Sequence, residues 1–364
     1  MSERLPVEVV VPLRWARPEP PAPVNGDVGR LGEFAAYLDN LASLAHVTVV
    51  DGSAPSLVRS HTEAFGPRVR VLTPQGSGLN GKVVGSLTGI HAARHELVVL
   101  ADDDVRYDPE SLRAVVDALQ NADVVRPQNV FISWPWHARW DTGRTLMARS
   151  VGADWPGTFG LRASAVRAMG GWDADVLFEN LEMVRTAQAN GLRVSNRPDI
   201  IVPRVVPSLR HFSGQRLRQA YDSWAQPGRL VAELAIVPLT VVLAVRRRRR
   251  RGLVLLAGAV VAGAVTGRQR YRPLPTPWDV PAWSLAWLVE RGVLSWCTVV
   301  VRLRGGVRYH GRRVTRAAHR PGQLAPRWVN LHGSRWPWSR VAVEPSIKAG
   351  VRSAVRELGP PGKV

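Results

Sequence analysis

The chain has 364 residues and a formal net charge of +20, with 45% hydrophobic residues and one cysteine, Cys297. This length suits one large domain or two ordinary ones, and the hydrophobic content excludes a disordered chain. A single cysteine excludes a disulfide framework and a cysteine-based metal cluster. The N-terminal segment lacks a basic region followed by an apolar run and a cleavage site, so we expect no secretory signal.

The positive charge is distributed unevenly along the chain. Residues 1–203 carry 20 basic and 23 acidic residues, whereas residues 204–364 carry 29 basic and 6 acidic residues. The second part also contains eight of the 14 tryptophans. This division indicates a near-neutral globular part and a cationic part that binds an anionic surface, either nucleic acid or an anionic lipid leaflet.

Short β-branched runs alternate with amphipathic stretches at the start of the chain. Strands are predicted at residues 7–13, 46–51, 69–74 and 95–104, and helices at residues 30–45, 56–66 and 79–94. Because alternating strands and helices form βαβ units, we predict an α/β fold with a mostly parallel sheet. In such sheets ligands bind beyond the carboxyl ends of the strands.

The alternation of predicted strands and helices continues to about residue 204. Asp108 and Pro109 suit the N-cap and first position of a helix. A strand at residues 122–129 follows, then a less regular region around residues 134–140. A further helix is predicted to stop at the Gly-Gly pair at residues 170–171. The next helix is predicted at residues 179–190, with a strand after it.

Three consecutive aspartates end the fourth predicted strand. Asp102 and Asp104 flank Asp103, and carboxylate oxygens are the ligands that hard cations such as Mg²⁺ prefer. An isolated triplet of this kind is more often a solvated acidic loop. However, Asp51 ends an earlier strand and Arg14 follows the first one. The carboxyl ends of the strands are therefore predicted to bring several polar side chains into one crevice.

Two further groups are candidates for chemistry. Lys82 opens a helix after a glycine-rich turn, where a cation suits a phosphate group; the alternative is an exposed lysine. Glu179 and Glu182 lie one turn apart on one helix face. They form either a solvated face or the source of a general base.

In their order along the chain, these features over residues 5–220 resemble the inverting family-2 glycosyltransferases of GT-A fold. "VVVPLR" resembles the first strand of that family, with a proline and a basic residue, here Pro12 and Arg14. "VVDGSAP" resembles the segment whose aspartate contacts the nucleotide base, which implies that role for Asp51. The resemblance implies a nucleotide-sugar donor and a mixed, mostly parallel sheet flanked by helices.

The long block "GLNGKVVGSLTGIHAARHELVVLADDDV" is similar to the most specific block of the family. The similarity implies that Lys82 is the family lysine and that Asp102 and Asp104 are the metal-binding pair. Asp102 and Asp103 are also predicted to contact the substrate. Mg²⁺ or Mn²⁺ at the aspartate pair would bridge the diphosphate and neutralise charge on the leaving nucleotide.

"HFSGQRLRQAYD" resembles the Gln-x-x-Arg-Trp motif of membrane-bound members. Gln215 and Arg218 match, whereas Gln219 stands where tryptophan is usual. Arg218, and Arg216 beside it, are predicted to stabilise the leaving group. His211 precedes the motif, and a late histidine completes the metal shell in many GT-A enzymes, although a lone histidine is more often structural.

"MGGWD" resembles the segment before the Glu-Asp motif, but that motif reads "FENLEM" here. Asn180 replaces the usual catalytic aspartate, and an amide cannot accept a proton usefully at neutral pH. We therefore predict Glu179, and after it Glu182, as the base that deprotonates the acceptor. The same departure leaves open a catalytically inactive relative that serves as a scaffold.

In the cationic part, two apolar runs flank six arginines at positions 246–251, and neither run clearly reaches the roughly 20 residues that span a bilayer. A third run contains Glu290 and Arg291. Since basic residues stay on the cytoplasmic side, an outward crossing by the first run would misplace the arginines. We therefore expect re-entrant or interfacial helices, with Trp283 and Trp287 at the headgroup level; an ordinary core hairpin is the alternative.

These features together predict three regions: a GT-A catalytic domain over residues 1–225, an apolar helical region with the arginine loop over residues 226–305, and a basic tail over residues 306–364. The predicted activity is inverting, metal-dependent transfer of a sugar to a lipid or lipid-linked saccharide. The site is predicted at the cytoplasmic side of the cell membrane, against anionic lipid. A nucleic-acid-binding protein is the rival, but the cationic part contains no recognisable reader motif.

Overall fold

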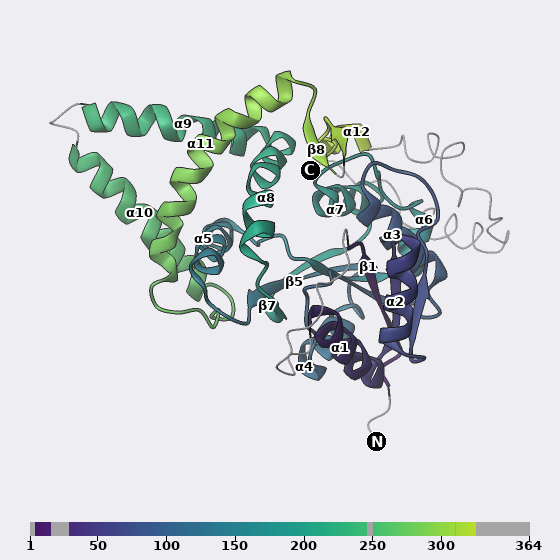
Figure 1. The fold of residues 1–364 in the computed structure, drawn as a ribbon. Helices are drawn as coiled ribbons and strands as arrows, with labels where there is room; N and C mark the ends of the chain where they lie inside the picture. Colours follow the sequence, from purple (N-terminus) through teal and green to yellow (C-terminus); the bar gives the residue numbers. More distant parts are fainter. Residues whose placement is uncertain (1–3, 16–28, 246–249, 310, 325–364) are drawn as a thin grey trace, which may run out of the picture.

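In the computed structural model, which describes residues 4–15, 29–245, 250–309 and 311–324, a seven-stranded sheet forms the centre of the first part of the chain (Figure 1). The strands are β1 (Val7–Leu13), β2 (His46–Asp51), β3 (Val69–Leu72), β4 (Leu97–Ala101), β5 (Val124–Phe131), β6 (Thr158–Arg162) and β7 (Val194–Arg204). Their order is β3-β2-β1-β4-β6-β5-β7. Strand β6 is antiparallel to β4 and β5, and the other neighbouring pairs are parallel. This mixed, mostly parallel sheet confirms the predicted fold class.

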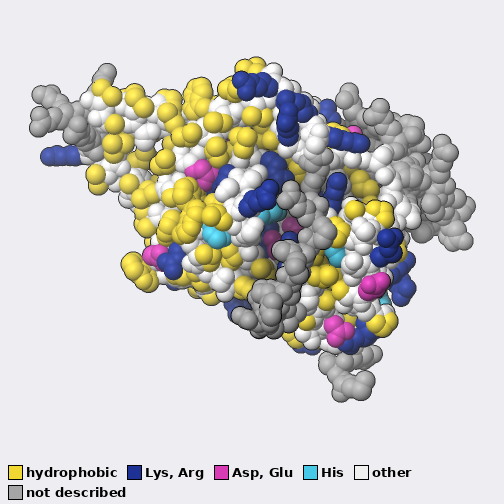
Figure 2. Space-filling model, in the orientation of Figure 1, with side chains coloured by type: hydrophobic (Ala, Val, Ile, Leu, Met, Phe, Trp, Pro, Cys, Tyr) yellow, Lys and Arg dark blue, Asp and Glu magenta, His cyan; other side chains and the backbone are white. Residues whose placement is uncertain are grey.

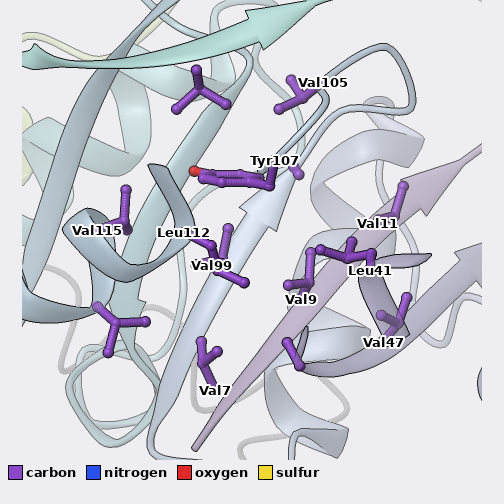
Figure 3. Packing of buried hydrophobic residues seen from close by; sticks show 14 of the residues in the cluster. Val7, Val9, Val11, Leu41, Val47, Val99, Val105, Tyr107, Leu112 and Val115 are labelled. Atoms are coloured by element: carbon purple, nitrogen blue, oxygen red, sulfur yellow. The ribbon is translucent and has the colours of Figure 1, made fainter. Parts of the chain in front are cut away.

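Both faces of the sheet are covered by helices, because successive side chains of each buried strand point to opposite sides. Val9 and Val99 face one side and belong to the core shown in Figure 3. Val10 and Val98 face the other. The helices that contribute to the first core are α1 (Arg30–Leu44), α2 (Pro55–Phe65) and α4 (Pro109–Ala118). Those of the second are α3 (Gly81–Ala92), α6 (Ala163–Ala168) and α7 (Glu179–Ala189).

Local sequence signals set several of these helix ends. The Asp108 carboxylate accepts a hydrogen bond from the Ser111 backbone, and the Ser111 hydroxyl accepts one from the Asp108 backbone, which closes a capping box before Pro109. Gly170 and Gly171 follow α6 with φ angles of 75° and 77°. Glycine adopts this left-handed conformation without strain, so the predicted Gly-Gly stop is confirmed.

The region around residues 134–140 contains a helix that the sequence did not predict, α5 (Trp136–Val151). Its buried face carries Asp141, Thr145 and Arg149 rather than an apolar stripe. These polar groups find partners on neighbouring elements; Arg149, for example, donates to the carbonyls of Gly267 and Pro198. The expectation of an irregular region was wrong because the helical face is satisfied by hydrogen bonds, and the hydrophobic periodicity is therefore absent.

After β7 the chain forms a helical region beside the sheet. It consists of α8 (Leu209–Tyr221), the 3-10 turn η1 (Asp222–Ala225), α9 (Pro227–Val245), α10 (Arg250–Gln269), the 3-10 turn η3 (Val280–Ala282) and α11 (Trp283–Leu303). Helices α10 and α11 pack on α5, and α11 also packs on α8 and α9. In Figure 1, α9, α10 and α11 extend away from the sheet, with α5 and α8 between them and the strands.

Three segments of this region are long and apolar enough to cross a membrane: Pro227–Val245, Arg251–Gln269 and Val280–Leu303. The expectation that the first two runs are too short is corrected, because the helices extend beyond the uninterrupted apolar letters. Hydrophobic side chains gather over the region of α9, α10 and α11 in Figure 2. Exposed apolar side chains of these helices include Val242 and Leu255. The arginine loop lies outside the described residues, apart from its last two positions.

The two tryptophans expected at the headgroup level differ in burial. Trp287 is buried in the packed face of α11, which corrects the expectation for this residue. Trp283 is half-buried, and its indole donates to Asp279, so its place at the headgroup level stays a prediction. The most exposed tryptophan of this region is Trp278, just before η3.

The chain then returns to the sheet. Strands β8 (Val307–Tyr309) and β9 (Arg312–Val314) form a hairpin, and α12 (Pro321–Leu324) follows. Backbone N–H groups of Leu177 and Phe178 donate to carbonyls of this returning segment, at 3.0 and 2.8 Å. The first residues of the predicted basic tail are thus part of the folded wall around α7, and residues 325–364 lie outside the described part.

Candidate functional site

A cleft of about 960 Å³ opens at the carboxyl ends of β1 and β4. The sheet supplies one wall, and helices α8, α9 and α11 with the β8–β9 hairpin supply the other. The polar side chains that line the cleft are Arg14, Lys82, Asp102, Asp103, Asp104, Asp141, Arg144, Glu179, Asn180, Arg204, His211, Gln215, Arg218, Gln219, Asp222, Arg229, Arg291, Tyr309 and Arg312. Pro12 also lines it. Most residues predicted from three separate sequence blocks therefore meet in one place.

Lys82 joins two of these blocks. Asn80 caps α3 and accepts from the Lys82 backbone, which fixes the lysine in the first turn. The Lys82 Nζ atom lies 2.7 Å from Asp102 Oδ1 and 2.9 Å from Glu179 Oε1. Burial alone would lower the pKa of Lys82, but the two carboxylates together raise it above its usual range. The lysine is therefore held charged between the two acids.

Asp102 is itself perturbed by the crowding of charge. Burial raises the pKa of Asp102 to about 6, and neighbouring Asp104 adds to this, while Lys82 and Arg204 oppose it. The other Asp102 oxygen, Oδ2, faces Gly157 at a position where a side chain would clash. A glycine here thus leaves room for the carboxylate at the end of β4.

Asp104 is held by Arg204, which ends β7. Arg204 Nε and Nη2 lie 2.9 and 2.8 Å from the same oxygen, Asp104 Oδ2. The second oxygen, Oδ1, is buried and has no hydrogen-bond partner among the described residues. A buried carboxylate oxygen without a partner is costly, so this atom indicates a ligand.

Asp103, between them, points to a different part of the cleft. Its Oδ2 accepts from the Trp15 indole at 2.8 Å and from Arg30 at 2.7 Å. Arg14, next to Trp15, lines the same side of the cleft. Asp103 therefore pairs with the loop after β1, whereas Asp102 and Asp104 remain together in the cleft. This separation reduces the electrostatic repulsion among the three aspartates.

Asp51 is buried and does not line the cleft in the described part of the chain. Its oxygens lie 2.6 Å from His61 Nδ1 and 2.9 Å from the Ser53 backbone nitrogen, which donates to it. Gly52, the next residue, does line the cleft. Asp51 therefore shapes the turn after β2 in this structure, and its predicted contact with a nucleotide base stays a prediction.

The structure does not bring Glu182 or Arg216 to the cleft in the described residues. Both Glu182 oxygens are held by His319, through its ring at 2.7 Å and its backbone nitrogen at 2.8 Å. Arg216 is buried between Asp141 and Glu290, at 2.7 Å from each. Glu182 lies one turn after Glu179, but its carboxylate contacts the returning segment and does not line the cleft. The two expectations fail because helix spacing alone does not show which neighbour packs on a face.

Helix α8 places three predicted residues on one face. His211, Gln215 and Arg218 all line the cleft, as the spacing of four and then three residues allows. The Ser208 hydroxyl accepts from the His211 backbone and caps the helix. Burial and neighbouring Arg218 lower the pKa of His211, so the imidazole is held neutral and able to bind a cation.

Asn180, at the position of the missing aspartate, lines the cleft while its amide donates to the Pro156 carbonyl at 3.0 Å. The sequence prediction overlooked a second carboxyl group nearby, Asp222. Burial, with help from Glu179, raises the pKa of Asp222 to about 8 against the opposing effect of surrounding arginines. One of its oxygens has no partner among the described residues. The sequence feature that could have identified Asp222 is the lone aspartate at the end of "HFSGQRLRQAYD".

Other lining residues come from elements that were not predicted to contribute to the site. Arg204 ends a strand, Arg229 and Arg291 come from apolar helices, and Tyr309 and Arg312 come from the β8–β9 hairpin. The Tyr309 hydroxyl donates to Asn80 Oδ1 at 3.4 Å, and Arg218 lies 5.3 Å from the tyrosine ring centre. The hairpin is thus fixed to both walls of the cleft.

A family profile described as "glycosyltransferase like family 2" matches residues 39–222. No curated protein sequence matches the chain. Among solved structures, the chain is similar to mannosyltransferase PcManGT from Pyrobaculum calidifontis, in complex with GDP-Man and Mn²⁺, with a TM-score of 0.45 and 18% identity over 81% of this chain and 88% of that one.

A second similar structure is glucosyl-3-phosphoglycerate synthase from Mycobacterium tuberculosis, in complex with Mn²⁺, UDP and glucosyl-3-phosphoglycerate. Its TM-score is 0.37, with 13% identity over 59% of this chain and 77% of that one.

Proposed function

Since the chain belongs to glycosyltransferase-like family 2 and is thus a glycosyltransferase with a nucleotide-sugar donor, we propose that it transfers the sugar with inversion to a lipid or lipid-linked saccharide at a membrane, with the help of Mg²⁺ or Mn²⁺. The observation that carries this proposal is the composition of the cleft. One wall has the acidic ends of the strands, and the other is formed by helices with exposed apolar faces. A polar donor and an amphiphilic acceptor can therefore meet there.

Asp102 and Asp104 are the residues that would hold the cation, with His211 from α8 as a third ligand. The donor set fits a hard divalent ion, because Asp104 Oδ1 is a buried oxygen without a partner among the described residues. A neutral imidazole can also serve as a metal ligand. When bound, the ion would act as a Lewis acid on the diphosphate.

The remaining cleft residues have separable roles in this proposal. Lys82 forms ion pairs with both Asp102 and Glu179, and so compensates their negative charge and holds them in place. Arg218 and Gln215 face the leaving group from α8. Pro12, Arg14 and Asp103 border the donor side. Glu179 is the proposed base, because it lines the cleft as a carboxylate directly beside Asn180.

Inversion follows if the acceptor attacks the anomeric carbon from the face opposite the nucleotide. The new bond joins the acceptor oxygen to the anomeric carbon as the bond to the diphosphate oxygen breaks. The acceptor proton passes to Glu179, and the leaving diphosphate keeps the bonding electron pair. Arg218 stabilises the charge that develops on that leaving group.

We place the cleft on the cytoplasmic side, against anionic lipid. Two features support this: the exposed apolar faces of α9, α10 and α11, and the excess of arginine in the same part of the chain. Basic residues stay on the cytoplasmic side and are attracted to its anionic lipids. The nucleotide-sugar donor would then come from the cytoplasm.

A screen of nucleotide sugars tests the proposal. The full chain, purified in detergent, is titrated with UDP- and GDP-sugars with Mn²⁺, with Mg²⁺ and with EDTA. At least one donor should bind ten times more tightly with a cation. Asp104→Asn should abolish this difference, whereas Asp117→Asn on the exposed face of α4 should preserve it. The absence of metal-dependent binding to every donor would refute the metal-dependent mechanism.

A further inference from the structure

Arg291, in the middle of α11, is a buried cation without a hydrogen-bond partner among the described residues. Its side chain is 0% exposed, and none of its three guanidinium nitrogens makes a hydrogen bond within the described residues. The nearest carboxylate oxygen in an ion pair, Glu233 Oε1, is 3.9 Å from Nε. Arg291 nevertheless lines the cleft. A guanidinium in this state is expensive, because burying an unpaired charge costs far more than burying a neutral group.

A second buried arginine, Arg149, shows the hydrogen bonds that a buried guanidinium makes when its role is structural. Arg149 is also 0% exposed, but its guanidinium donates to the carbonyls of Gly267, Pro198, Arg270 and Arg272 at 2.6–3.0 Å. The chain can therefore satisfy a buried guanidinium completely. The absence of such partners around Arg291, within the described residues, indicates that its partner is a ligand in the cleft.

Two more arginines stand with Arg291, and the nearby acids do not neutralise the group. Arg229, in the first turn of α9, and Arg218, on α8, line the same cleft. Glu233 is already shared, since Oε1 accepts from Arg229 at 2.9 Å and Oε2 accepts from the Ser295 hydroxyl at 3.0 Å. Burial raises the pKa of Asp222 to about 8, which leaves this nearby acid mostly neutral at pH 7. The region has an excess of positive charge that suits a compact anion.

The position of this group separates it from the donor side. The Asp102–Asp104 pair, where the donor diphosphate is proposed to bind, ends the sheet, whereas Arg229 and Arg291 come from the apolar helices α9 and α11. Side chains such as Val231 and Val289 are exposed on these same two helices. A ligand that reaches the arginines along this surface must combine an apolar chain with an anionic head.

We propose that Arg291, with Arg229, binds the phosphate group of the acceptor, which is therefore a phosphate-bearing lipid. This inference rests on the proposed function and gives the acceptor a chemical class. The apolar chain of that lipid lies along the exposed faces of α9 and α11, and its phosphate enters the cleft between them. Two arginines match a phosphate because each can present two parallel N–H donors to its oxygens.

Binding of an amphiphilic probe to the full chain in detergent micelles tests this assignment. Decyl phosphate is compared with decanol, which has the same chain and no phosphate. We expect the wild-type protein to bind decyl phosphate at least tenfold more tightly. Arg291→Gln should remove that preference, and Arg291→Lys should restore part of it. Arg304→Gln, at the exposed end of the same helix, should behave as wild type.

The nucleotide-sugar arm of the experiment distinguishes the two possible sources of phosphate. For Arg291→Gln, the Kd of the nucleotide sugar with Mn²⁺ should stay within twofold of wild type. An equal or larger loss of donor affinity would overturn the proposal in favour of a donor diphosphate at Arg291. Unchanged binding of decyl phosphate would overturn it as well. Failure of the wild-type protein to bind any nucleotide sugar refutes the proposed function separately, since the decyl phosphate arm does not depend on it.

Folding of the variant can be monitored independently. Arg291 has no hydrogen-bond partner among the described residues, so its replacement by glutamine removes no hydrogen bond there. It removes the 3.9 Å ion pair with Glu233, which keeps its bonds from Arg229 and Ser295. The Tm of Arg291→Gln should therefore equal or exceed that of wild type. A lower Tm together with lost lipid binding would show a structural role and overturn the assignment.

Discussion

Gly157→Ala is a small change that tests the aspartate pair without removing a charge. A Cβ atom at this position would lie 2.6 Å from Asp102 Oδ2 and 3.2 Å from its Cγ. The backbone of Gly157 does not have a positive φ, so alanine causes no conformational strain. The whole effect therefore arises from contact with the Asp102 carboxylate. We expect the carboxylate to move and the protein to remain folded.

The size of the effect follows from the distances. Ordinary contact between carbon and another heavy atom requires roughly 3.4 Å, so the carboxylate must shift by roughly 0.8 Å. Lys82 Nζ is 2.7 Å from the other oxygen, and a shift of that size takes the pair out of hydrogen-bond range. A charge-assisted bond contributes about 1.5–3 kcal/mol, which corresponds to roughly a 10–150-fold change in an equilibrium constant.

Activation by Mn²⁺ is the appropriate assay. The cation concentration for half-maximal nucleotide-sugar binding should rise at least tenfold in Gly157→Ala, while the Tm falls by only a few degrees. Gly152→Ala is the matched control, because a Cβ there has no atom within 4 Å. An unchanged Mn²⁺ requirement in Gly157→Ala, with the Asp102–Lys82 pair intact, would refute the assignment of Asp102 as a metal ligand.

Two other substitutions separate charge effects from structural ones. The pKa of Asp222 is raised to about 8 in the folded protein, from roughly 3.9 in an unfolded chain. Folding therefore takes up a proton between these pH values, and the free energy of unfolding decreases as the pH rises toward 8. The Tm advantage of Asp222→Asn over wild type should thus increase between pH 5 and pH 8; an advantage that decreases over this range would contradict the raised pKa. Arg216→Gln should destabilise the protein by about 3–5 kcal/mol, since it leaves Asp141 and Glu290 buried without their partner. Its affinity for nucleotide sugar, measured below the unfolding transition, should match wild type, and a selective loss of affinity would instead support the predicted contact with the leaving group.

The residues that sequence could predict are those placed by local structure. Lys82 follows a helix cap, Asp102 follows a buried strand, and Gln215 and Arg218 share one face of a helix. Each of these positions depends on periodicities of two or 3.6 residues, which a single sequence displays. The parallel order of β1, β2 and β4 then brings them together, because the carboxyl ends of these strands share an edge.

Residues whose role depends on packing between distant segments could not be predicted in this way. Glu182 fits a base by spacing, but its face is covered by His319, which lies 137 positions later in the chain. Glu290 and Arg291 interrupt an apolar run, and from the sequence alone they only weaken the prediction of a membrane helix. In the structure Glu290 pairs with Arg216, and Arg291 lines the cleft. Their partners come from other elements, so no local pattern marks them.

Helix α8 explains why the cleft and the apolar helices work as one unit. One of its faces turns Gln215 and Arg218 to the cleft, and another turns Arg216 to α5 and α11. Movement of α11 relative to the sheet would pull on the Arg216–Glu290 pair and so shift the cleft face of the same helix. Helices α8 and α11 are joined by this buried ion pair and by the hydrogen bond from Arg302 to the Tyr221 hydroxyl, and Arg291 follows Glu290 directly, so contacts between these helices connect the apolar region with the cleft.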